Sequence, residues 1–174
     1  MSDSRLASFE TAVLPHLDAA YNLARWMTRN EADAEDVSQE ALLRAYRFYD
    51  TMRGANCRAW LLTIVRNTCF TWLQANRPAE CTTAFDEKVH SVGLHGSEPD
   101  AALIASANRE MVRQAIEELP IEFREVFVLR EVEGATYNEI ADIAGIPPGT
   151  VMSRLARARQ RLQQCLARRL ANEV

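Results

Sequence analysis

The apolar residues of this chain recur with the spacing of an α-helix, and this periodicity limits its possible folds more than any other feature. One stripe runs through Phe9, Val13, Leu17, Tyr21, Ala24 and Met27, and Pro15 is expected to bend or break its start. The same spacing predicts further helices over residues 32–49, 58–76, 102–119 and 121–132. No stretch alternates between apolar and polar residues as a half-buried strand would. The sequence therefore predicts an all-α fold.

Residues 78–100 interrupt this pattern, because they show no sustained period and contain two prolines and two glycines among small and acidic residues. They also account for the net charge of −4. Residues 1–77 and 101–174 each hold equal numbers of acids and bases, whereas residues 78–100 hold five acids and one base. We therefore predict two small helical domains, residues 1–77 and 101–174, joined by a flexible acidic linker.

The remaining composition narrows the class of protein. With 48% hydrophobic residues among 174, the chain can form a packed core. No apolar run approaches the ~18 residues of a membrane helix, and the first residues lack the basic-then-apolar pattern of a secretory signal. The four cysteines lie far apart, as is typical of free thiols in a reducing compartment. These features predict a cytoplasmic protein without membrane insertion.

Two tracts contain arginines but no acids. Residues 51–79 include four arginines, and residues 143–172 include six. Such tracts are typical of surfaces that contact a polyanion such as DNA. The alternative is that both are solvated helix faces.

Residues 136–162 have the features of a helix-turn-helix. Thr136 followed by Glu139 is a capping-box pattern that opens a short helix. Gly145 suits the turn after this helix, and Pro148 suits the first turn of the next one. Two short helices joined by a glycine-bearing turn are typical of a DNA-binding motif.

Helical geometry divides the second helix of this motif into a buried and an outer side. The predicted buried residues are Val151, Leu155, Ala158 and Leu162, and the opposite side presents Gly149, Ser153, Ala156, Arg157 and Gln160. Ser153 and Arg157 are placed for base edges. Arg154 and Arg161, on one flank, are better placed for phosphates, and Met152 lies toward the other flank. A helix that only packs by one face is the alternative.

Residues 33–47 predict a helix with an acidic face that Asp36, Gln39 and Glu40 share. Stabilisation by the helix dipole explains acids in the first turn, but it explains Glu40 poorly because this residue lies deeper in the helix. An acidic face repels DNA, so we expect a basic protein partner for it.

The helix predicted over residues 58–76 contains the unusual pair Arg66 and Asn67. Asparagine is unfavourable in the middle of a helix, so Asn67 requires a polar partner or a ligand. Phe70 and Trp72 suit core packing, with base stacking as the alternative. The preceding polar loop, which includes Met52, Arg53 and Asn56, predicts a pocket for an unstacked base.

These segments resemble bacterial sigma factors of the extracytoplasmic-function (ECF) group, and the resemblance covers nearly the whole chain. DAEDVSQEALLRAYR is similar to the helix that contacts the β′ clamp helices of RNA polymerase. RAWLLTIVRN is similar to the segment beside the −10 promoter element, and GTVMSRLARAR to the −35 recognition helix. The order and spacing of the motifs make the combination more specific than any one of them.

The resemblance implies a protein that directs core RNA polymerase to specific promoters, contacts the β flap as well as the clamp helices, and is restrained by an anti-sigma factor. Residues 1–77 would be sigma region 2 and residues 101–174 sigma region 4. The implied polymerase contacts are Asp36, Gln39 and Glu40. The implied −10 contacts are Met52, Arg53, Asn56, Arg66 and Asn67. The implied −35 contacts are Gly149, Thr150, Met152, Ser153, Arg154, Arg157 and Arg161, with Met152 where many relatives carry a basic residue.

Two other classes of function remain as alternatives. A stand-alone helix-turn-helix regulator explains residues 136–162 equally well but gives no reason for the acidic face. An enzyme is disfavoured because the histidines and cysteines form no nucleophile–base pattern and no glycine loop suits a phosphate. Zinc bound by Cys81, His90 and His95 is a further alternative. We expect no catalytic residue, metal, cofactor or small-molecule substrate.

Overall fold

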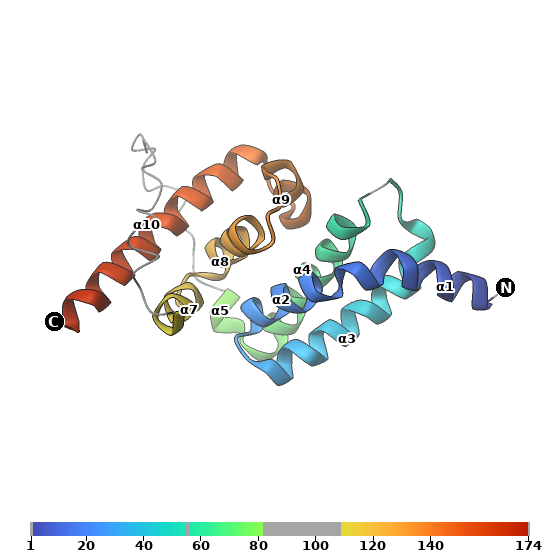
Figure 1. Ribbon diagram of the computed structural model, residues 1–174, viewed down its shortest axis with the longest axis horizontal. Helices are drawn as coiled ribbons and strands as arrows, with labels where there is room; N and C mark the ends of the chain where they lie inside the picture. Colours follow the sequence, from blue (N-terminus) through green and yellow to red (C-terminus); the bar gives the residue numbers. More distant parts are fainter. Residues whose placement is uncertain (1, 55, 82–108, 174) are drawn as a thin grey trace.

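The computed structural model of the protein describes residues 2–54, 56–81 and 109–173 (Figure 1). Every regular element in these ranges is a helix, which confirms the predicted all-α class. The elements are α1 (Ser2–Val13), η1 (Leu14–His16), α2 (Leu17–Thr28), α3 (Glu31–Phe48), η2 (Tyr49–Thr51), α4 (Cys57–Asn76), α5 (Pro78–Cys81), α7 (Arg109–Glu117), α8 (Ile121–Phe127), η3 (Val128–Val132), α9 (Tyr137–Ala144) and α10 (Pro148–Asn172).

Helices α2, α3 and α4 pack against one another and form the core of the N-terminal module. The first predicted stripe is interrupted at Pro15, where the 3-10 turn η1 separates α1 from α2. Arg29 ends α2 in the left-handed conformation. The Asn30 side chain then caps α3 by accepting a hydrogen bond from the Asp33 backbone N–H at 3.0 Å. These two residues set the tight turn that brings α3 back along α2.

Helices α8, α9 and α10 form the core of the C-terminal module, and α7 packs beside α10. The helix predicted over residues 102–119 is present as α7 from Arg109, while residues 102–108 lie outside the described ranges. Pro120 separates α7 from α8, where the sequence predicts a helix end. After Phe127 the backbone continues as the short π-helix η3.

The two modules pack directly against each other. Helix α4 contacts α9, and α2 contacts α8 (Figure 1). Buried apolar residues of both modules belong to one contiguous cluster, which includes Leu62 and Val65 of α4 and Ile140 of α9. The sequence predicted two domains but did not predict that they would dock.

The predicted linker starts differently from expectation. Pro78–Cys81 form the short helix α5 on α4, because proline favours the first turn of a helix and Glu80 forms ion pairs with Arg29 and Arg77. The rest of the linker predicted over residues 78–100 lies outside the described residues.

Candidate functional site

The helix-turn-helix predicted over residues 136–162 is formed by α9 and α10. The Thr136 hydroxyl accepts a hydrogen bond from the Glu139 backbone N–H at 3.2 Å, and Glu139 Oε2 accepts one from the Thr136 backbone N–H at 2.8 Å. This reciprocal pair is the predicted capping box. Gly145 follows with φ 68°, a conformation that glycine adopts without steric cost, and Pro148 is the first residue of α10. The local signals in the sequence therefore place both helices correctly.

Helix α10 has the buried and outer sides that its sequence predicts. Val151, Leu155, Ala158 and Leu162 are buried. Gly149, Met152 and Ser153 are exposed near its beginning, and Thr150 is half-buried. The Ser153 hydroxyl donates a hydrogen bond to the Thr150 carbonyl at 3.0 Å. The small outer residues leave room for a nucleic acid to approach the backbone.

The arginines of α10 occupy different environments. Arg157 is half-buried on the outer side. The Arg161 guanidinium lies over the Phe123 ring, 4.9 Å from its centroid. Arg154 departs from the expected position on the flank, because its side chain is only 13% exposed and lies 4.0 Å from the buried carboxylate of Glu125.

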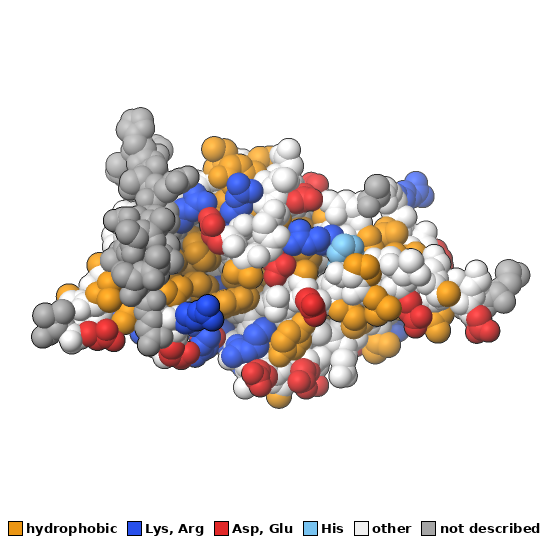
Figure 2. Space-filling model, viewed as in Figure 1, with side chains coloured by type: hydrophobic (Ala, Val, Ile, Leu, Met, Phe, Trp, Pro, Cys, Tyr) orange, Lys and Arg blue, Asp and Glu red, His pale blue; other side chains and the backbone are white. Residues whose placement is uncertain are grey.

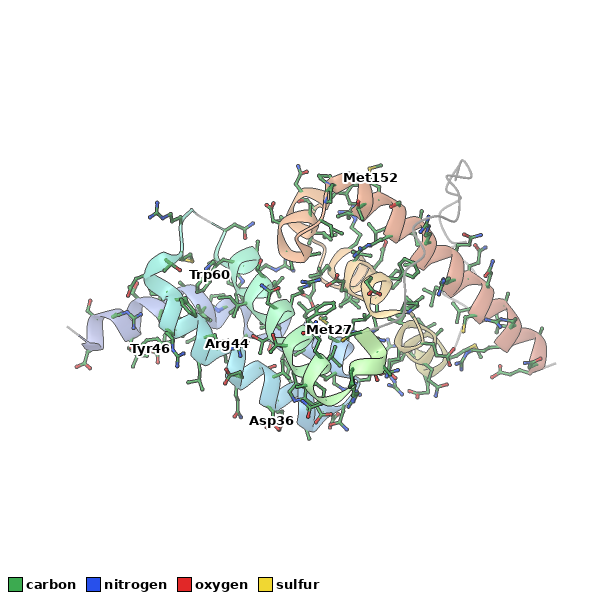
Figure 3. All side chains as sticks on the ribbon, turned by 180° about the vertical axis from the view of Figure 1, so that it is seen from behind. Met27, Asp36, Arg44, Tyr46, Trp60 and Met152 are labelled. Carbon is green, nitrogen blue, oxygen red and sulfur yellow. The ribbon has the colours of Figure 1, made fainter. Side chains whose placement is uncertain are left out.

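The acidic face predicted on α3 lies at the surface. Asp36, Gln39 and Glu40 are all exposed, and Glu40 Oε1 lies 2.8 Å from Arg44 Nε. Leu43, two helical turns after Asp36 and on the same face, is 66% exposed. The sequence signal for Leu43 was its position in line with the acids, away from the apolar stripe. Figure 3 shows Asp36 and Met152 at opposite edges of the molecule, so this face lies far from the beginning of α10.

The predicted −10 segment begins with a surface loop. Arg53 is exposed, Met52 is half-buried, and Gly54 has φ 99°, which favours glycine. Asn56 caps α4 with its side-chain oxygen, while its Nδ2 donates a hydrogen bond to Glu139 at 2.8 Å. The end of this loop therefore touches the capping box of the other module.

Arg66 and Asn67, also predicted for the −10 surface, are adjacent but differ in exposure. Arg66 donates two hydrogen bonds to Glu125, at 2.8 Å to Oε2 and 3.2 Å to Oε1, and lies 4.0 Å from the Phe70 ring centroid. Asn67 is exposed and accepts a hydrogen bond from Arg66 at 3.3 Å. Arg66 is therefore the polar partner that a mid-helix asparagine requires.

Glu125 of α8 contacts one arginine from each of the two modules. Its side chain is fully buried between Arg66 and Arg154. Burial raises the pKa of the Glu125 carboxyl, and the hydrogen bonds from Arg66 oppose that rise. The sequence signal for this residue was an acid inside the apolar segment IEFREVF, since a buried carboxylate needs a cationic partner.

Several arginines of the two acid-free tracts form ion pairs with acids from elsewhere in the chain. Arg58 pairs with Glu133 at 3.3 Å, and Arg159 pairs with Glu131 at 2.6 Å. Figure 2 accordingly shows acidic and basic side chains interspersed on the face that it presents. A run of sequence without acids therefore does not predict a bare positive surface in the folded chain.

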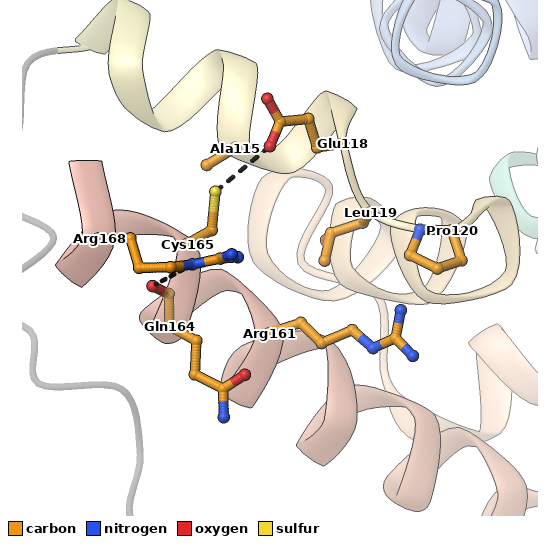
Figure 4. A pocket seen from close by; sticks show the side chains of 8 residues that line it. All are labelled: Ala115, Glu118, Leu119, Pro120, Arg161, Gln164, Cys165 and Arg168. Carbon is orange, nitrogen blue, oxygen red and sulfur yellow. Dashed lines mark hydrogen bonds between the residues drawn. The ribbon is translucent and has the colours of Figure 1, made fainter.

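A pocket of about 390 Å³ lies between the α7–α8 turn and α10 (Figure 4). Its lining residues are Ala115, Glu118, Leu119, Pro120, Arg161, Gln164, Cys165 and Arg168. Within it, the Cys165 thiol donates a hydrogen bond to Glu118 at 3.4 Å. The sequence did not predict this pocket. Its mixture of apolar, acidic and basic side chains matches no particular ligand.

The described residues show neither a group of possible metal ligands nor a helix that could span a membrane. Within residues 2–54, 56–81 and 109–173, no three His, Cys, Asp or Glu side chains come together as possible metal ligands. His90 and His95 of the alternative zinc site lie outside these ranges. None of the helices in the part that the structure describes is long and apolar enough to cross a bilayer. All four cysteines are free thiols.

Comparison with known proteins assigns both modules. Residues 12–78 match the sigma-70 region 2 family, and residues 109–162 match sigma-70 region 4. The chain is 35% identical over 148 residues to an ECF RNA polymerase sigma-E factor of Haemophilus influenzae, covering 81% of this chain and 77% of that protein. It is 31% identical over 166 residues to the RNA polymerase sigma-H factor of Pseudomonas aeruginosa, covering 91% and 86%.

Solved structures agree with these matches. The sigma factor RpoE of Bartonella quintana, in complex with the anti-sigma factor NepR, has a TM-score of 0.71 and 30% identity, covering 92% of this chain and 97% of that chain. CnrH, in complex with the cytosolic domain of CnrY, has a TM-score of 0.65 and 25% identity, covering 93% and 89%. The helix-turn-helix, the preceding helical module and these relatives together show that the chain belongs to the ECF sigma factors of RNA polymerase.

Proposed function

We propose that this protein is an alternative sigma factor that binds core RNA polymerase and directs transcription initiation at specific promoters. The observation that carries the proposal is the presence of both sigma regions in one chain, at residues 12–78 and 109–162. A stand-alone regulator requires only the helix-turn-helix, so the region 2 match favours the sigma factor. The functional units are residues 1–77, the linker 78–100 and residues 101–174.

The acidic face of α3 is the proposed contact with the β′ clamp helices of polymerase, and region 4 is proposed to contact the β flap. Asp36, Gln39 and Glu40 are exposed together, and Leu43 adds apolar surface in the same place. An exposed acidic surface with an apolar residue beside it suits a basic protein surface and repels DNA.

The promoter contacts divide between the modules. Gly149, Thr150, Met152, Ser153 and Arg157 of α10 are proposed to face the −35 duplex, with Arg154 and Arg161 holding phosphates. Met52, Arg53, Asn56, Arg66 and Asn67 are proposed to hold unstacked −10 bases. Unstacking costs a few kcal/mol per base, which stacking and hydrogen bonds in the site offset.

The remaining parts of the proposal follow from this role. The protein acts in the bacterial cytoplasm without catalytic residues, cofactor or small-molecule substrate. An anti-sigma factor restrains it, as the complex of RpoE with NepR from Bartonella quintana illustrates for a protein of similar fold.

The test is transcription by purified core polymerase on fragmented genomic DNA, with and without this protein. We expect new discrete start sites only when the protein is present. Absence of new start sites, together with no binding to core polymerase, would contradict the proposal and favour the regulator.

The polymerase contact is tested separately with Glu40→Lys. Glu40 forms only an exposed ion pair with Arg44, so this change should leave the fold intact. We expect a sharp loss of affinity for core polymerase. Glu10→Lys, the same charge change at an exposed position of α1, is the matched control and should bind normally. Equal binding by the two variants would move the contact away from α3.

A further inference from the structure

Four uncharged residues form one side of α10 near its beginning. Gly149, Met152, Ser153 and Ala156 stand three and four positions apart, so they share one side of the helix. Gly149, Met152 and Ser153 are exposed, and Ala156 is half-buried. These four residues are called the neutral stripe below. Because the first residues of a recognition helix are the ones that reach base edges, the neutral stripe is the part of α10 that comes closest to bases.

Met152 is the one large apolar residue of the neutral stripe. Its exposed fraction is 57%, whereas Val151 beside it and Leu155 almost one turn later are buried. The core of the C-terminal module is therefore packed without Met152, and folding gives no reason for an apolar side chain at this position. Single exposed apolar residues are common on protein surfaces. What distinguishes Met152 is its place among the residues that approach DNA.

The neighbours of Met152 within the stripe are small, so its side chain extends beyond them. A Cβ atom added at Gly149, one turn earlier, would meet none of the surrounding side chains within 4 Å. Ala156, one turn later, carries only a methyl group. Figure 3 shows Met152 at the edge of the molecule, near the beginning of α10. A long, unbranched thioether side chain can adjust to a base edge from this position.

Ser153, which follows Met152, has a hydroxyl group whose hydrogen is already engaged. It donates this hydrogen to the Thr150 carbonyl at 3.0 Å, so towards a base its oxygen can only accept. An accepting oxygen suits the amino group of adenine or cytosine and does not suit the two acceptors of guanine. Ser153 therefore disfavours a guanine at the place that it faces.

The major groove offers one kind of apolar group to a side chain such as Met152. Guanine, adenine and cytosine present hydrogen-bonding atoms there, whereas thymine presents its C5 methyl group beside O4. The end of a methionine has no strong donor or acceptor. Against guanine it would remove water from N7 and O6 without replacing the lost hydrogen bonds, which is unfavourable. Against thymine it buries two apolar groups together.

We propose that Met152 selects a thymine in the −35 element through apolar contact with the C5 methyl group of that base. This role rests on the proposed function and deepens it, because it names the base that one residue of the −35 surface reads.

The first experiment removes only the methyl group from the DNA. Transcription on genomic fragments supplies promoters, and randomising the −35 element of the strongest one shows which bases the holoenzyme of core polymerase and this protein prefers. Each preferred thymine is then replaced singly by deoxyuridine, which pairs in the same way but lacks the C5 methyl group. In competition for limiting holoenzyme, we expect one position at which uracil lowers promoter binding about threefold, the effect of burying one methyl group.

The second experiment changes the protein. With Met152→Ala, the thymine and uracil promoters should bind equally well at that position. With Met152→Arg, the preferred base at the same position should become guanine, because a guanidinium donates to both N7 and O6. Val132→Ala is the matched control, since Val132 is an apolar residue of the same module that is 46% exposed but lies in η3. This control should distinguish thymine from uracil as wild type does.

The outcomes separate this inference from the proposed function. If new start sites appear but wild type binds thymine and uracil promoters equally at every −35 position, the inference is wrong and the proposed function stands. The same holds if Met152→Ala still distinguishes them. If Met152→Ala instead weakens binding to core polymerase with the base preference unchanged, Met152 contacts protein and the inference is wrong.

Two further results also decide the matter. If no start sites appear, the proposed function fails and the inference fails with it. If circular dichroism shows that Met152→Ala has lost helix, the Met152→Arg chain and the uracil promoters with wild type decide in its place.

Discussion

Leu43 is an exposed apolar residue on the α3 face that we propose contacts polymerase. It is 66% exposed on the face that carries Asp36 and Glu40. Leu43→Ala should weaken binding to core polymerase by about 1–2 kcal/mol, because alanine has less apolar surface to bury in the proposed complex than leucine. Anisotropy titration with labelled protein measures this loss. Leu6→Ala, at a leucine of α1 that is 44% exposed, is the control and should bind as wild type does.

Arg157 is the residue for which base reading is most directly tested. It lies on the outer side of α10 next to Ser153. Arg157→Ala should lower affinity for a duplex carrying the −35 sequence by about 1–3 kcal/mol if the guanidinium contacts a base. Arg113→Ala, an arginine of α7 in the same module, should leave that affinity unchanged. The same loss on duplexes of unrelated sequence would reassign Arg157 to a phosphate contact.

Residue exposure was predictable where it depends on helical periodicity and unpredictable where it depends on a distant partner. The spacing in α10 and α3 placed Val151, Ser153 and Asp36 on the correct sides. The burial of Arg154 and Arg66 depends on Glu125, which comes from α8. Since long arginine side chains reach several ångströms, their direction follows the nearest buried carboxylate rather than the helix face alone.

Among the elements, α9 shows most clearly how local sequence defines a helix. Its start is set by the capping box of Thr136 and Glu139, and its end by the left-handed Gly145. These signals act between residues a few positions apart, so they were readable without the fold. The docking of α4 on α9 and the start of α5 at Pro78 were not, because each depends on contacts with other helices.

The capping box predicts a pH dependence of stability. Hydrogen bonds from the Thr136 backbone and from Asn56 lower the pKa of Glu139 below its ordinary 4.5. A lowered pKa means that the carboxylate stabilises the folded chain at neutral pH, and that this contribution is lost as pH falls from 4.5 through the folded-state value. Glu139→Gln should therefore reduce the free energy of unfolding by about 0.3–1 kcal/mol at neutral pH.

Urea unfolding at neutral pH and below pH 4.5 measures this effect. The difference between wild type and Glu139→Gln should shrink in acid. Asp142→Asn removes an exposed carboxylate at the other end of α9 and is the control. It should show no loss of unfolding free energy that disappears in acid. If Glu139→Gln lowered the free energy of unfolding by the same amount at both pH values, the charge of Glu139 would not be the cause of the stabilisation.

For the whole molecule, the continuous apolar cluster predicts cooperative unfolding of both modules. Scanning calorimetry of the wild type should show one transition whose calorimetric and van't Hoff enthalpies agree. Glu125→Gln removes the negative charge that pairs with Arg66 between the two modules. This variant should therefore broaden or split the transition. Two resolved transitions in the wild type would mean that the modules unfold independently.

The amino-acid sequence by itself determined the all-α class, the two helical modules, the helix-turn-helix and the sides of α3 and α10 that face solvent. These features depend on periodicity and on caps, which act over a few residues. Only the tertiary structure decided that the modules dock and that Glu125 covers Arg66 and Arg154. The physical reason is that burial and pairing of charges depend on side chains brought together from distant positions, and no local pattern records which of them will meet.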